Sequence, residues 1–157
     1  MNKKITAAFL LLLTGCAFHQ APYIAYAGSP ALSETAVFAA FDHQQQGVLS
    51  SILIVDDKET SCAQVGCPAW VRVLPGQHSF IVRYVPHFRL DGAFIIRRRA
   101  ELTVTLPKME ARHVYQAHYR EVDNTVTMSV EDLGERPKFG IDLGLEGVNR
   151  KYYPVEF

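Results

Sequence analysis

The chain has 157 residues, 48% of them hydrophobic, and 16 basic side chains balance 16 acidic ones. This length and apolar content suit one domain with a sizeable core plus short extensions. The balanced charge argues against nucleic acid as a partner, because nucleic-acid-binding domains carry an excess of basic side chains.

The first residues have the order of a secretory signal. Two lysines open the chain, an apolar run covers residues 5–13, and the small pair Thr14–Gly15 precedes Cys16. The run is too short for a helix that crosses a bilayer, which needs about 20 residues. We therefore predict a signal peptide over residues 1–15, whose removal takes away two lysines and leaves a slightly acidic chain.

The stretch Leu13-Thr14-Gly15-Cys16 resembles the lipobox of bacterial lipoproteins. In that family the cysteine is acylated and becomes the mature N-terminus, so the resemblance implies that Cys16 carries palmitate and further acyl chains. Two or more chains hold a protein stably on a membrane, whereas one is marginal. A residue other than Asp after this cysteine usually goes with the outer membrane, and here it is Ala17. We expect a lipid-anchored, periplasm-facing lipoprotein; an ordinary signal peptide cut elsewhere is the alternative.

Residues 16–35 contain Gly, Pro, Ser and Ala, show no clear period and carry one charge, which predicts a flexible tether. Short β-type segments then alternate with polar turns, over residues 35–41, 48–55, 70–74, 78–85, 93–106, 113–122 and 125–133. Pro75–Gly76 predicts a hairpin turn, because Pro presets its backbone angle and Gly tolerates positive φ. No long window has the 3.6-residue period of an amphipathic helix.

The alternation assigns apolar residues to one face of these strands. The expected core set is Val71, Val73, Phe80, Val82, Tyr84, Leu102, Val104, Leu106, Tyr115, Ala117, Tyr119, Val126, Met128 and Val130. The pattern predicts an all-β fold, a single antiparallel β-sandwich of about 6–7 strands over residues 36–135. Residues 136–157 are either an extension packed by Phe139, Ile141, Leu143, Tyr152 and Tyr153, or an arm that binds a partner.

Cys62 and Cys67 remain as an even pair if Cys16 carries lipid. In an exported protein such a pair favours a disulfide. Free thiols and a metal or redox role are the alternatives, but the four-residue spacer differs from that of thioredoxin-like pairs and no second ligand pair completes a zinc set. We predict a Cys62–Cys67 disulfide and no metal site.

A positive surface is the strongest candidate for binding a partner. Strand alternation places Arg72, Arg83, Arg97 and Arg99 on one outward face, with Trp70 interleaved. Guanidinium forks match carboxylate and phosphate groups, so the expected partner is an envelope protein or an anionic envelope polymer. The alternative is a solvated face on which outward arginines pair with a cross-strand acid such as Glu101.

The segments SILIVDD, WVRVLPGQHSFIVRY, LTVTL, HVYQAHY and VTMSVEDLGE occur in an order similar to that of small bacterial envelope lipoproteins of uncharacterised function. The domains of those lipoproteins resemble PEGA-type β-sandwich modules. The resemblance covers Ala36 to Glu135 and departs where Ala111-Arg112 stands in place of an expected Ala-Gly. It implies a fold and a compartment, but no reaction.

The sequence contains neither G-x-S-x-G nor H-E-x-x-H, so we predict no enzyme and no cofactor. The predicted function is a non-catalytic binding or assembly module of the bacterial cell envelope, in contact with the membrane through its lipid anchor. One alternative is a dedicated lipoprotein subunit of a secretion or pilus machine. A periplasmic hydrolase whose site is assembled only by tertiary contact is another.

Overall fold

A computed structural model describes residues 21–41, 48–62, 67–90, 93–96, 99–143 and 148–157. Regular structure in these ranges consists of strands and one short 3-10 helix, which confirms the all-β prediction. None of the helical structure in these ranges is long and apolar enough to cross a membrane.

The N-terminal half supplies the shorter strands. The elements in chain order are β1 (Tyr23–Ile24), η1 (Leu32–Glu34), β2 (Ala36–Ala39), β3 (Val48–Val55), β4 (Lys58–Glu59) and β5 (Trp70–Val73). The longer strands follow, and they are β6 (Gly76–Leu90), β7 (Ala93–Ile96), β8 (Ala100–Met109), β9 (His113–Val122), β10 (Thr125–Glu135), β11 (Gly140–Leu143) and β12 (Lys151–Pro154).

These strands form two five-stranded sheets and one two-stranded hairpin. The first sheet has the order β1-β5-β2-β9-β10, the second has the order β4-β3-β6-β7 with β8 also paired to β6, and β11 pairs with β12. The pairs β1/β5 and β2/β9 are parallel. The prediction of a purely antiparallel arrangement is therefore wrong at these two pairs.

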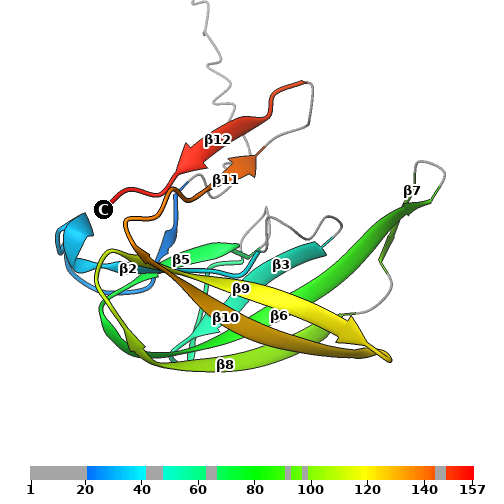
Figure 1. Cartoon of the computed structure of the whole chain (residues 1–157), viewed down its shortest axis with the longest axis horizontal. Helices are drawn as coiled ribbons and strands as arrows, with labels where there is room; N and C mark the ends of the chain where they lie inside the picture. Colours follow the sequence, from blue (N-terminus) through cyan, green and yellow to red (C-terminus); the bar gives the residue numbers. More distant parts are fainter. Residues whose placement is uncertain (1–20, 42–47, 63–66, 91–92, 97–98, 144–147) are drawn as a thin grey trace, which may run out of the picture.

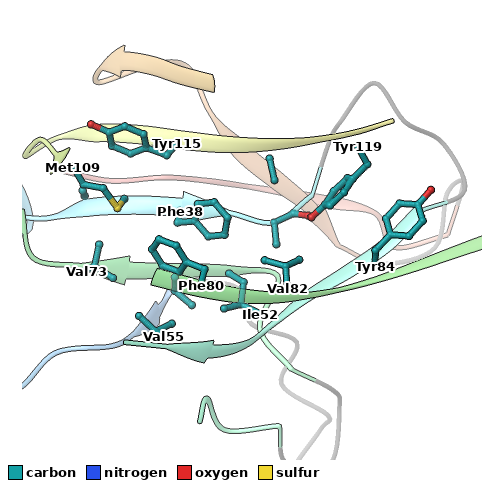
Figure 2. Close-up of a cluster of buried hydrophobic side chains, with 14 residues drawn as sticks. Phe38, Ile52, Val55, Val73, Phe80, Val82, Tyr84, Met109, Tyr115 and Tyr119 are labelled. Atoms are coloured by element: carbon teal, nitrogen blue, oxygen red, sulfur yellow. The ribbon is translucent and has the colours of Figure 1, made fainter. Parts of the chain in front are cut away.

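The main core lies between the two large sheets. Phe38 of β2 stacks on Phe80 of β6 with ring centroids 4.1 Å apart, and Figure 2 shows this pair at the centre of the cluster. Tyr84 and Tyr119 meet at one end, with centroids 5.0 Å apart. Every residue of the core set expected from alternation is either buried in this cluster or packed against it, which confirms that part of the prediction.

Two polar turns form where the sequence predicts them. Asp56 and Asp57 connect β3 to β4 with φ of 49° and 63°, and Asp123 and Asn124 connect β9 to β10 with φ of 48° and 64°. Both central residues of a two-residue type I′ turn need positive φ, which Asp and Asn tolerate well. Arg112, which stands where the resemblance implied Gly, has φ of 69° and lies in the same left-handed region.

The predicted hairpin at Pro75–Gly76 is wrong. β5 pairs with β1 and β2, whereas β6 pairs with β3, β7 and β8. The turn therefore carries the chain from one sheet to the other, with Gly76 at φ of 138°. A turn of this composition looks the same in sequence whether its strands are paired or lie in facing sheets.

The C-terminal hairpin covers the second face of the first sheet. Phe139 and Ile141 pack against Trp70, Val37 and Val114, with Tyr153, Val155 and Phe157 at the margin of this second core. Figure 1 shows β11 and β12 lying beside the end of the first sheet that carries β2 and β5. Of the two interpretations of residues 136–157, the structure supports the packed extension, although Tyr152 is half-exposed.

Two parts of the predicted tether, residues 23–25 and Thr35, join the domain, which corrects the prediction of a flexible tether there. Tyr23 and Ile24 pair with Val71 and Arg72 of β5, and the N–H of Ala25 donates to the carbonyl of Arg72 at 3.0 Å. Thr35 is fully buried. The extended backbone of β1 thus completes the edge of the first sheet.

At the opposite end of the fold, β6 continues past the other strands. The segment expected as one strand over residues 93–106 is divided into β7 and β8, which both pair with β6. Figure 1 shows β7 and the facing part of β6 extending away from the rest of the molecule.

Candidate binding pocket at Arg72

The residues of the predicted positive surface lie in different places. Trp70 and Arg72 of β5 are 0% and 4% exposed, so the prediction that they face solvent is wrong. Val71 and Val73 point into the main core, and the face opposite to them is covered by the C-terminal hairpin. Alternation separates the two faces of a strand correctly, but it does not show that a second layer covers the outer one.

Arg83 lies on β6 in the other sheet. Its Nη2 is 3.1 Å from Oε1 of Glu101, the residue directly opposite on β8. This is the cross-strand pair of the alternative interpretation. Arg99 is exposed just before β8, and Arg97 lies outside the described residues. The structure therefore does not bring Arg72 and Arg83 onto one surface.

Arg72 is fixed in place by Thr35, which lies just before β2, and by Glu156 and Phe157, which follow β12. Its Nη1 donates to Oγ1 of Thr35 at 2.7 Å, and its Nη2 donates to the backbone carbonyl of Glu156 at 2.7 Å. The guanidinium also lies over the ring of Phe157, with Cζ 5.3 Å from the ring centroid. These contacts join β5 to the segment before β2 and to the segment after β12.

The positive charge of Arg72 is only weakly compensated. Its two hydrogen bonds go to neutral oxygens, and no carboxylate among the described residues forms an ion pair with it. Burial lowers the pKa of the guanidinium from its ordinary value, while the smaller electrostatic influence of Tyr26 and Glu156 raises it. An arginine nevertheless stays protonated in proteins, so this site keeps a desolvated cation.

A pocket of about 300 Å³ opens beside this cation. Its walls come from the N-terminal and C-terminal segments and from β5: Ala21, Pro22, Ile24, Leu32, Arg72, Tyr153, Pro154 and Glu156. Ile24 and Leu32 are 58% and 43% exposed, and both line this pocket, so exposed aliphatic surface gathers there. The arrangement combines apolar walls with one buried positive group.

The disulfide predicted between Cys62 and Cys67 is present. Oγ1 of Thr60 lies 3.7 Å from Sγ of Cys62 and donates to the carbonyl of Ile52, so the bridged loop is fixed to β3. Arg83 and Glu59 line a hollow of about 390 Å³ beside the bridge. Cys16, the predicted lipid site, lies outside the described residues.

Three histidines whose side chains the structure describes contact separate carboxylates. Nδ1 of His78 is 2.6 Å from Asp56, Nδ1 of His113 is 2.9 Å from Asp132, and Nε2 of His118 is 2.9 Å from Glu131. Within the part of the chain that the structure describes, no group of three or more His, Cys, Asp or Glu side chains is placed to hold a metal ion.

Comparison with known protein families, curated proteins and solved structures finds no match for this chain. The pocket at Arg72 was not predicted from the sequence. One signal was available: Val37, Ala39 and Val114 are apolar at positions that alternation assigns to the outer face. Strands that are apolar on both faces indicate burial on both sides, and Trp70 belongs to the same set.

Proposed function

We propose that this chain is a lipid-anchored, extracytoplasmic, non-catalytic binding or assembly module of the bacterial cell envelope, with a PEGA-like β-sandwich domain. The observation that carries the proposal is the sequence Leu13-Thr14-Gly15-Cys16, placed five residues before an all-β domain whose described part starts at Ala21. Ala17 favours the outer membrane within this proposal.

The number of residues between Cys16 and Ala21 limits the distance between the domain and its lipid anchor. Five extended residues span at most about 18 Å. Acylation at Cys16 therefore holds the end of the fold that carries β1, and with it the Arg72 pocket, close to the bilayer. A module that is held this near binds membrane components or envelope proteins at the membrane surface.

The chemistry of the pocket supports binding rather than catalysis. The eight described residues that line it provide a guanidinium, a carboxylate, a phenol and apolar side chains. No hydroxyl or thiol nucleophile of Ser, Thr or Cys is among them, and neither is an imidazole. Such a set orients a charged ligand, but it lacks the Ser–His or Cys–His pair that acyl-transfer hydrolases use.

The test uses the anchor residue in the native host. Cys16→Ala should move the protein from the membrane fraction to the soluble periplasmic fraction, while Cys62→Ser serves as a control that removes a different cysteine. In-cell photo-crosslinking from position 99 and from position 152 then identifies neighbours. Envelope proteins or polymers support the proposal, and components of a secretion or pilus machine support the alternative. Membrane association of Cys16→Ala that equals wild type contradicts the proposal.

A further inference from the structure

The burial and the hydrogen bonding of Arg72 suit the binding of an anionic ligand. Arg72 is 4% exposed, and its hydrogen bonds to described residues, one from Nη1 and one from Nη2, use two of five N–H donors. A buried cation without a matching anion is costly, and the structure keeps it at the wall of a pocket rather than in a sealed core.

The surroundings of Arg72 favour an apolar group next to that anion. Ile24 and Leu32 present their exposed aliphatic side chains at the pocket, and Pro22 and Pro154 complete the apolar walls. A pocket of about 300 Å³ is at the lower end of the range for small-molecule sites. It suits a medium-length alkyl chain better than a large polar molecule.

Among the described lining residues, Glu156 carries the one acidic side chain. It is exposed, whereas Arg72 is buried, so water screens the carboxylate far more than it screens the guanidinium. The positive group therefore dominates inside the pocket, and the negative group lies where a ligand meets solvent.

We propose that this pocket binds an amphiphile with an anionic head, a carboxylate or a phosphate, and a medium-length alkyl chain. The head accepts hydrogen bonds from the guanidinium of Arg72, whose planar fork matches both oxyanions. The chain lies against Ile24 and Leu32. The inference goes beyond the proposed envelope function and does not depend on it, since it is argued from the described residues that line the pocket.

The experiment uses the mature chain with Cys16→Ala, so that neither an anchor nor a detergent competes for the pocket. Octanoate, octyl phosphate and octanol are titrated separately by isothermal calorimetry. We expect one equivalent of octanoate or octyl phosphate to bind, with octanol at least about tenfold weaker, because a charge-assisted hydrogen bond to a buried group is worth that factor or more. Preference for octanoate indicates a fatty acid, and preference for octyl phosphate indicates a lipid phosphate.

Four variants locate the site. Arg72→Met should weaken binding of the anions about tenfold or more, and Arg83→Met, in the other sheet, is the matched control that should bind as wild type. Arg72→Met also removes two structural hydrogen bonds, so Ala21→Trp, which fills the pocket and keeps Arg72, gives a second loss of binding in a folded protein. Glu156→Gln should bind octanoate more tightly, because it removes a repulsive charge.

Three results would overturn the proposal. One is octanol binding as tightly as octanoate, and another is the absence of heat from either anion. The third is wild-type affinity in Ala21→Trp, because the anion would then occupy another place on the protein.

Discussion

The packing of the C-terminal hairpin predicts a large loss of stability for Phe139→Ala. Phe139 is 5% exposed and stacks against Phe41 with ring centroids 5.6 Å apart, in the cluster that contains Trp70 and Ile141. Replacing a buried Phe by Ala costs about 3–5 kcal/mol. The two-stranded hairpin relaxes more easily than a central strand, so we expect the lower end, about 3 kcal/mol. That value corresponds to a fall in Tm of about 6–12 °C for a chain of this size.

Urea unfolding of the Cys16→Ala protein measures this change, and Trp70 provides a local signal. It is the single tryptophan of the chain and fully buried in the same cluster. Its fluorescence should shift to longer wavelength in the native state of Phe139→Ala, because water reaches the indole. Tyr152→Ala changes a half-exposed residue of the same hairpin and should cost less than about 0.5 kcal/mol. A loss below about 1 kcal/mol for Phe139→Ala, with unchanged fluorescence, would refute the second core.

Three further predictions concern the bridge, a titrating acid and a surface pair. Replacing Cys62 and Cys67 by Ser should lower the free energy of unfolding by about 2 kcal/mol without moving the protein from its membrane fraction; equal stability of the reduced and oxidised protein would contradict this. Burial alone raises the pKa of Asp132, but hydrogen bonds from the Gly134 N–H and from His113 outweigh it and hold this pKa below its ordinary value of 3.8. A carboxylate whose pKa is lower in the folded state stabilises the fold at any pH above its unfolded-state pKa, and this contribution is lost as the pH falls toward its folded-state pKa. Asp132→Asn should therefore flatten the fall of Tm below about pH 4, and an unchanged slope would count against this. The Arg83–Glu101 pair is largely solvent-exposed, and a double-mutant cycle should give a coupling below about 1 kcal/mol that vanishes in high salt; a larger, salt-independent value would show that the pair is desolvated.

Local sequence signals predicted the main core and two of the turns. Strand alternation is a property of the backbone itself, so it identified Phe80, Val82 and Tyr119 as inward residues without knowledge of their partners. The Asp123–Asn124 turn is equally local, because it depends on which residues tolerate positive φ.

The remaining features depend on contacts between distant segments. The prediction that Arg72 faces solvent failed because residues more than eighty positions later cover that face, and its partner Thr35 lies 37 positions earlier. Tyr23 and Ile24 form a strand only because the edge of β5 is available to them. No local period encodes such a pairing, and the Pro75–Gly76 turn shows the same limit, since its flanking strands belong to different sheets.

The anchor at Cys16 is the central claim, and the mass of the N-terminal peptide of the protein from native membranes tests it most directly. The account predicts a peptide that starts at Cys16, lacks residues 1–15 and carries the added mass of a diacylglycerol thioether, with or without a third acyl chain. A peptide that contains residues before Cys16, or one that starts elsewhere with an unmodified cysteine, would contradict it.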